Sequence, residues 1–91
     1  MIIIEILFFL GGIKMSENIY KIIGNNIKKY RTKNNISQLK LSELSGYSHE
    51  YIRRIESKKS RNGFSIEALY FISLALKINI SNLFEGVKIY E

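Results

Sequence analysis

The chain has 91 residues, of which 46% are hydrophobic, and this length and composition suit one small domain with a single core. It has no cysteine and one histidine, which excludes disulfide bonds and thiolate metal sites and argues against a zinc cluster. Few nucleophiles and no glycine-rich phosphate loop also argue against an enzyme, so we expect no catalytic residues, no metal and no cofactor.

Residues 1–15 begin with an apolar run that one glutamate interrupts and two glycines follow. The run is too short for a membrane-spanning helix, which needs about 20 apolar residues, and it lacks the basic start and cleavage site of a signal peptide. We interpret residues 1–15 as an N-terminal extension, such as a misassigned start codon would produce, ahead of a domain at residues 16–86 and a tail at residues 87–91. The alternatives are a segment that docks on the domain, one that pairs subunits, and a membrane or oligomerisation anchor.

The first predicted helix runs from about residue 16 to residue 33. Asn34 and Asn35 mark its expected end, because asparagine tolerates the left-handed conformation. Apolar residues recur at helical spacing along this stretch, which is typical of a helix with one buried face. These residues are Ile19, Ile22, Ile23, Ile27 and Tyr30.

Two short helix patterns occupy residues 37–56, and each follows a serine that can accept a backbone N–H at a helix start. Ser37 precedes the first pattern. Within it, Leu41 and Leu44 are three positions apart, and we expect them to lie on one face of the helix.

Ser48 precedes the second pattern, in which Ile52 and Ile55 are three positions apart on one face. Gly46 lies between the two patterns, where the chain must turn sharply and where a positive φ angle is often required. Two helices joined by a turn of three or four residues form a helix-turn-helix, which delivers its second helix to the DNA major groove.

Two further helices complete the predicted all-α fold. Ser65 is the expected N-cap of the fourth helix, which Asn79 ends, and Ser81 is the expected N-cap of a short fifth helix, which Gly86 ends. Their apolar residues are Ile66, Leu69, Ile72, Leu74, Ala75 and Leu76 in the fourth helix and Leu83 and Phe84 in the fifth.

The net charge of +6 is concentrated in one part of the chain. Residues 28–61 hold ten basic side chains and three acids, a balance of +7, whereas the remaining four lysines and five glutamates sum to −1. A solvated lysine-rich surface would show the same excess, but its position on the helix-turn-helix segment favours a surface that faces phosphates.

The window of residues 37–56 resembles the Cro/cI-type helix-turn-helix of phage repressors and the related bacterial XRE regulators. The matched features are the serine-glutamine pair that opens the first helix, the glycine after it, the serine that opens the second helix and the Ile-x-x-Ile-Glu run that closes it. They correspond to Ser37-Gln38, Gly46, Ser48 and residues 52–56. The similarity extends from about residue 22 to residue 84, and it implies a compact five-helix lambda-repressor-like DNA-binding domain.

Three positions depart from the family pattern. Ser42 stands where alanine is usual, so its hydroxyl needs a hydrogen-bond partner. Lys58 stands where a turn glycine is common, and Leu39 stands where a polar residue is usual and leaves an apolar side chain exposed. These departures affect local detail and leave the predicted fold intact.

With Ile52 and Ile55 facing inward, the outward residues of the second helix are the expected base contacts. Arg54 is suited to a bidentate contact with guanine, and Glu50 to a cytosine amino group, although an acid at this position also suits the helix N-terminus. The full set of expected base contacts is His49, Glu50, Arg53 and Arg54.

The resemblance also implies contacts to DNA phosphates, which set affinity and register without reading sequence. Tyr51 belongs to this group, with packing beside the first helix as its alternative. The expected phosphate contacts are Ser37, Gln38, Ser48, Tyr51, Lys58, Lys59, Arg61 and Asn62. In some relatives an arginine late in the first helix pairs with the glutamate that closes the recognition helix, which implies a structural salt bridge between Arg31 and Glu56.

The resemblance therefore implies a cytoplasmic transcriptional regulator, a repressor that binds double-stranded DNA as a homodimer on a palindromic operator. An antitoxin or a restriction-modification controller of the same fold is an alternative, with a toxin or another protein as an additional partner. A protein-interaction module that has lost DNA binding is a further alternative, and the basic segment argues against it. No membrane partner is expected. Candidates for a subunit interface are Ile80, Leu83, Phe84, Ile89 and Tyr90.

Overall fold

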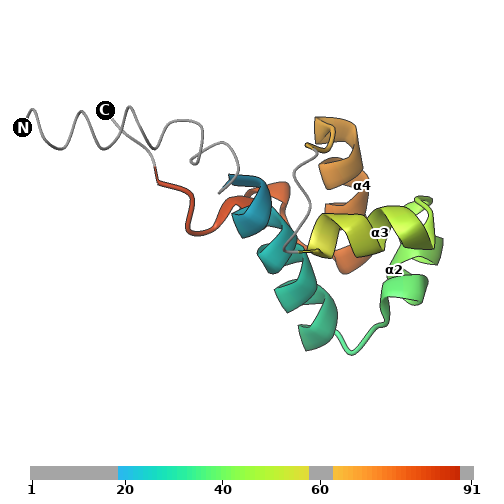
Figure 1. Cartoon of the computed structure of the whole chain (residues 1–91). Helices are drawn as coiled ribbons and strands as arrows, with labels where there is room; N and C mark the ends of the chain where they lie inside the picture. The colour runs from blue at the N-terminus through green and yellow to red at the C-terminus, as the bar shows by residue number, and fades with distance from the viewer. Residues whose placement is uncertain (1–18, 58–62, 89–91) are drawn as a thin grey trace, which may run out of the picture.

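The computed structural model describes residues 19–57 and 63–88, which form the bundle of helices shown in Figure 1. Within these ranges there are four α-helices, one 3-10 helix and no strand, so the expected all-α class is confirmed for them. The expected count of five α-helices is not confirmed, because the last element is a 3-10 helix. The elements are an N-terminal helix described over residues 19–33, α2 (Gln38–Ser45), α3 (His49–Glu56), α4 (Ile66–Leu76) and the 3-10 helix η1 (Ile80–Phe84).

Serine residues begin three of these helices. Ser37, Ser48 and Ser65 each accept, at 3.0 Å, a hydrogen bond from the amide of the residue three positions later. The prediction that Ser81 caps the last helix is wrong. Asn79 is the N-cap of η1, because its side-chain oxygen accepts from the amide of Ser81 at 3.0 Å. Asparagine competes well with serine for this role, and here it comes first along the chain.

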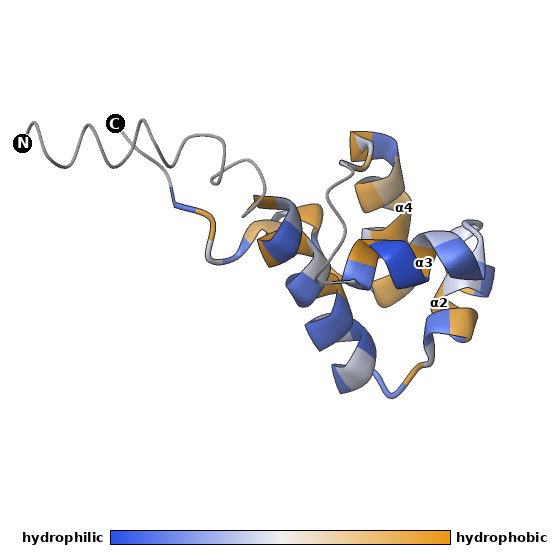
Figure 2. Ribbon diagram, in the orientation of Figure 1, coloured by the Kyte–Doolittle hydropathy of each residue, from blue (hydrophilic) through white to orange (hydrophobic). Residues whose placement is uncertain are grey.

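The hydrophobic core lies where the N-terminal helix, α2, α3, α4 and η1 meet. In the hydropathy colouring of Figure 2, α4 is mostly hydrophobic and α3 mostly hydrophilic. Each element contributes at least one fully buried aliphatic side chain, so burial of apolar surface stabilises the whole bundle. The core residues are Ile23, Ile27, Leu41, Ile52, Ile55, Leu69, Ile72, Leu76 and Leu83.

Leu41 and Leu44, which the sequence places on one face of the helix, differ in their burial. Leu41 is fully buried, whereas Leu44 is 50% exposed. The buried positions of α2 are Leu41, Ser42 and Ser45, which lie within an arc of about 100° at 3.6 residues per turn. Leu44 lies about 60° outside that arc, so the short helix turns it toward solvent.

Gly24 lies where the N-terminal helix crosses the end of α3. A Cβ atom at this position would collide with the backbone carbonyl oxygen of Ile55. The missing side chain therefore lets the two helices approach more closely than any other residue would permit. Sequence reasoning assigned Gly24 no role.

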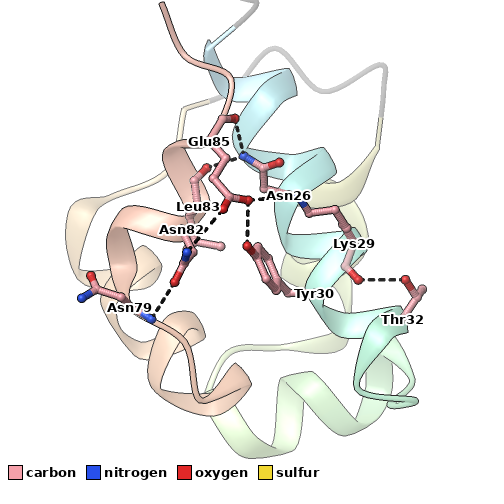
Figure 3. A network of polar contacts seen from close by, with 8 residues as sticks. All are labelled: Asn26, Lys29, Tyr30, Thr32, Asn79, Asn82, Leu83 and Glu85. Carbon is pink, nitrogen blue, oxygen red and sulfur yellow. Dashed lines mark hydrogen bonds and ion pairs between the residues drawn. The ribbon is translucent and has the colours of Figure 1, made fainter.

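A polar network holds the C-terminal end of the described chain against the N-terminal helix (Figure 3). The Nδ2 atom of Asn26, which is buried, donates to the carbonyl oxygens of Leu83 at 2.8 Å and Glu85 at 2.9 Å. The Glu85 carboxylate accepts from the Tyr30 hydroxyl at 2.7 Å and from Lys29 Nζ at 3.0 Å. η1 is thus fixed to the N-terminal helix by hydrogen bonds as well as by Leu83 in the core.

The Glu85 network predicts a pH-dependent contribution to stability. The hydrogen bond from Tyr30, followed by that from Lys29, lowers the pKa of the Glu85 carboxyl from 4.5 to about 2. A carboxyl whose pKa is lowered by folding stabilises the fold above its unfolded pKa, and this contribution is lost as the pH falls through the folded pKa. We therefore expect Glu85→Gln to lower the free energy of unfolding modestly at pH 7, because solvent screens the exposed pair. The deficit should shrink between pH 4.5 and pH 2.

Urea denaturation of both proteins at several pH values between 7 and 2.5 measures this deficit. A deficit that stays constant across the series would show that the carboxylate charge contributes nothing.

Candidate nucleic-acid interface

The turn between α2 and α3 has the geometry of a helix-turn-helix. Gly46 follows α2 in the left-handed conformation, with φ 84° and ψ 3°, and its amide donates to the carbonyl oxygen of Ser42 at 3.0 Å. A residue with a side chain would be strained at this φ angle. The buried hydroxyl of Ser42 donates to the carbonyl oxygen of Leu39 at 2.7 Å, so the serine in place of alanine is satisfied within its own helix. Leu39 is 52% exposed.

The residues of α3 divide into a buried side and an exposed side. Ile52, Ile55 and Glu56 are buried and lie within an arc of about 100°. The exposed residues lie within an arc of about 140° on the opposite side of the helix. They are His49, Glu50, Arg53 and Arg54, the four predicted base contacts. The structure thus places these four side chains together in solvent on one surface of α3.

The two arginines of this surface have different neighbours. Arg53 Nη1 lies 3.4 Å from Glu50 Oε2, and the two side chains are 61% and 71% exposed, so this ion pair is weak and can open. The guanidinium carbon of Arg54 lies 5.9 Å from the centroid of the Tyr51 ring. Within the described ranges no carboxylate forms an ion pair with Arg54, which leaves its donors available to a ligand.

Tyr51 is half-buried at the edge of the core. Its ring stacks on that of Tyr47 with 5.0 Å between centroids. Burial raises the pKa of its hydroxyl above the ordinary value of 10.0, while a backbone hydrogen bond from Ser65 lowers it. The Tyr51 side chain thus packs on Tyr47 and the core, and its hydroxyl accepts a backbone hydrogen bond at the start of α4.

A buried polar cluster ties α3 to the N-terminal helix and to α2. Arg31 Nε and Nη2 donate to the two carboxylate oxygens of Glu56 at 2.7 and 2.8 Å, a bidentate ion pair whose side chains are 10% and 2% exposed. Arg31 Nη1 also donates to the carbonyl oxygen of Ile36 at 2.9 Å, and Gln38 Nε2 donates to Glu56 at 3.0 Å. The two residues that the resemblance pairs therefore fix the end of α3, and Gln38 joins them.

Apart from Tyr51, the predicted phosphate contacts fall into two groups, one within the described residues and one outside them. Ser37 and Ser48 are exposed at the N-termini of α2 and α3, where amide groups and the helix dipole favour anions. Gln38 is half-buried, and its amide nitrogen is committed to Glu56. The other group, Lys58, Lys59, Arg61 and Asn62, lies outside the described residues.

Sequence reasoning missed two contributions to this site. The link between Gln38 and Glu56 joins residues 18 positions apart, and no local pattern indicates it. Gly24 sets the distance between the N-terminal helix and α3, and an isolated glycine within a helical pattern was the only signal for it.

The described ranges also lack two kinds of feature. None of their helices is both long and apolar enough to cross a membrane. Nor do three or more histidine, cysteine, aspartate or glutamate side chains gather there as a metal site would require.

The capped helices, the left-handed glycine turn and the exposed polar surface of α3 define a helix-turn-helix DNA-binding domain. The chain matches the helix-turn-helix family model over residues 27–83 and belongs to this family, the XRE-type regulators that the sequence resembles. It is a DNA-binding transcriptional regulator.

Similar proteins agree with this assignment. The chain is 34% identical over 73 residues to the control protein C.SmaI of Serratia marcescens, covering 78% of this chain and 84% of that protein. Its fold is similar to the crystal structure of the restriction-modification controller protein C.AhdI from Aeromonas hydrophila, with a TM-score of 0.66, 26% identity, and coverage of 71% of this chain and 96% of that chain. The clp gene regulator ClgR from C. glutamicum shares the fold, with a TM-score of 0.65 and 22% identity. The match covers 71% of this chain and 82% of that chain.

Proposed function

We propose that the protein represses transcription in the cytoplasm as a homodimer on a palindromic operator, with residues 16–86 as its DNA-binding domain. The observation that carries the proposal is the division of α3. On one side, Ile52 and Ile55 are buried in the core and Glu56 belongs to the buried polar cluster. The other side presents an imidazole, a carboxylate and two guanidinium groups to solvent. Such directional donors and acceptors distinguish base pairs in the major groove.

Each exposed side chain has a distinct role in this proposal. Arg54, which is free of ion pairs within the described ranges, donates two hydrogen bonds to O6 and N7 of a guanine. Glu50 accepts from a cytosine amino group after its exposed pair with Arg53 opens. His49 donates to a guanine or a phosphate, and Arg53 then reaches an adjacent base or phosphate.

The size of α3 supports a dimer. Its eight residues span about 12 Å, which covers three or four base pairs. A DNA site of three or four base pairs occurs too often in a genome to be specific for one promoter. A two-fold symmetric dimer doubles the number of base pairs that are read, with half-sites about one helical turn apart. Of the expected interface residues, Leu83 is fully buried within the protomer, so a symmetric contact must use other residues.

Phosphate contacts supply affinity in this proposal. The N-termini of α2 and α3 and the basic residues of segment 58–62 would bind the backbone on either side of the groove. Selection from random duplex DNA at two salt concentrations tests the whole proposal. A palindromic consensus with affinity that falls steeply in salt is the expected result, and the absence of any enriched sequence would overturn it.

Two substitutions should separate base contacts from phosphate contacts. Arg54→Ala should cost about 1–3 kcal/mol of binding free energy at the position that Arg54 reads and should relax specificity there in both half-sites. Lys59→Ala should weaken binding to all DNA sequences evenly. It should also reduce the slope of the logarithm of the binding constant against the logarithm of the salt concentration by about one, the loss of one phosphate contact. Sequencing of the DNA selected by each variant makes the comparison. Equal, sequence-independent losses would show that Arg54 contacts phosphate only.

A second candidate function is favoured by the comparisons. A protein at 34% identity and a solved structure at 26% identity are both controller proteins, which favours a restriction-modification controller over an antitoxin. Methyltransferase and endonuclease genes beside its own gene, with the selected consensus in their shared promoter, would support this role. A neighbouring toxin gene, and copurification of its product with this protein, would support the antitoxin instead.

A further inference from the structure

Helix α4 exposes an apolar stripe along its outer side. Of the six large hydrophobic residues exposed in the described ranges, four belong to this helix. The stripe consists of Ile66, Tyr70, Phe71 and Leu74, which are 67%, 50%, 42% and 52% exposed. Ile66, Tyr70 and Leu74 follow one another at intervals of four positions, and Phe71 lies three positions before Leu74, so the four residues fall within an arc of about 140° on one side of the helix. The rings of Tyr70 and Phe71 contact each other edge to face, with 5.5 Å between their centroids. They therefore form one aromatic surface in the middle of the stripe.

This stripe is unusual because the opposite side of α4 already faces the core. Leu69, Ile72 and Leu76 are buried there, and Glu67 is the one charged residue of α4, so apolar residues occupy most of the circumference of the helix. A helix of this kind is normally covered on both sides, and an exposed apolar strip along its length indicates a docking surface.

The N-terminal part of the chain meets the described structure beside the start of this stripe. The ring of Tyr20 lies edge to face with that of Phe64, with 5.2 Å between centroids. Phe64 precedes Ile66, the most exposed residue of the stripe, by two positions. The chain that precedes residue 19 therefore starts from the N-terminal end of α4.

The connecting segment is long enough to reach the whole stripe. Residues 11–18 can span about 27 Å when extended, and α4, with 11 residues, is about 16 Å long. The segment begins with Gly11 and Gly12, which allow the chain to reverse direction. Residues 2–10 can thus lie anywhere along the stripe.

We propose that residues 2–10 of the same chain dock on the α4 stripe and cover it. Eight of these nine residues are isoleucine, leucine or phenylalanine, and the ninth is Glu5. A second copy of α4 packed on the stripe would still leave these eight apolar side chains in water. Docking within the chain covers both apolar surfaces at once, and the short tether gives a high effective concentration. This docking does not depend on the proposed operator.

A disulfide cross-link tests the proposal in the full chain, which has no native cysteine. The test protein carries Leu7→Cys with Phe71→Cys, and the matched control carries Leu7→Cys with Lys40→Cys, an exposed position on α2 outside the stripe. Mild oxidation should give a cross-linked monomer several-fold faster in the test protein than in the control. Equal rates, no cross-link, or mainly cross-linked dimers would each overturn docking within the chain, and the dimers would point to a second copy as the occupant.

A second experiment needs no introduced thiol. Serine at positions 4, 7 and 8 of the full chain (Ile4→Ser, Leu7→Ser and Phe8→Ser) should uncover the stripe and raise fluorescence of the hydrophobic dye ANS, with the helical circular dichroism unchanged. Unchanged dye fluorescence would overturn the proposal. Binding of the native chain to phospholipid vesicles, with no cross-link in the first experiment, would also overturn it in favour of a membrane surface.

Discussion

Replacing Glu56 with alanine should lower the free energy of unfolding by about 3–5 kcal/mol. The substitution leaves the Arg31 guanidinium, which is only 10% exposed, without its bidentate partner, and it also removes the acceptor of Gln38. A buried charge without a partner keeps its desolvation cost and loses the attraction that offset it. A domain of this size has about 5–15 kcal/mol of total stability, so the loss takes a large part of it.

Urea denaturation monitored by circular dichroism measures this loss. Glu43→Ala is the matched control, because Glu43 forms an exposed ion pair with Lys40 at 3.9 Å and its removal should cost less than about 1 kcal/mol. If the alanine variant does not fold, Glu56→Gln keeps an acceptor without the charge and should cost less. Equal losses from Glu56→Ala and Glu43→Ala would contradict a stabilising role for the buried cluster.

Replacing Gly24 with alanine should cost about 1–3 kcal/mol of stability, toward the upper end of this range. Alanine normally stabilises a helix interior relative to glycine by about 1 kcal/mol, so the expected sign is opposite to the usual one. The reason is the collision of the new Cβ atom with the Ile55 carbonyl oxygen, which belongs to the backbone and cannot rotate away. Relief requires the N-terminal helix and α3 to move apart.

The same variant should weaken operator binding, because the displaced helix is the one proposed to enter the groove. Asn25→Ala is the control, since Asn25 is exposed on the same helix and its substitution should be neutral or slightly stabilising. Thermal unfolding and DNA binding of both variants give the comparison. A Gly24→Ala protein as stable as the control would mean that the helices separate without cost.

Much of the fold was predictable because the decisive signals are local. A serine before an apolar pattern predicts an N-cap, and Ser37, Ser48 and Ser65 all begin helices. The spacing of Ile52 and Ile55 predicts which side of α3 is buried. The residues on the opposite side of the helix are then expected to be exposed. The position of Gly46 predicts a left-handed turn, because few other residues accept that conformation.

The features that sequence reasoning missed depend on contacts between distant segments. Asn26 donates to carbonyl groups 57 and 59 positions away, and nothing in its own neighbourhood distinguishes it from an exposed asparagine. A spacing of three places Leu41 and Leu44 on one face of α2, but it does not indicate how far the buried part of that face extends. The buried residues of α2 are Leu41, Ser42 and Ser45, so the buried arc ends before it reaches Leu44. The packing of α2 against the other helices determines where this arc ends.

The division of α3 has a consequence for how such proteins diverge. The side chains proposed to read bases are exposed, and surface substitutions usually change stability by less than about 0.5 kcal/mol. Ile52, Ile55 and Glu56 hold the helix whatever its outer residues are. A duplicated gene could therefore acquire a new target sequence through a few substitutions at His49, Glu50 and Arg54, without passing through an unfolded intermediate. One scaffold can in this way supply regulators that act in the same cell without interfering with one another.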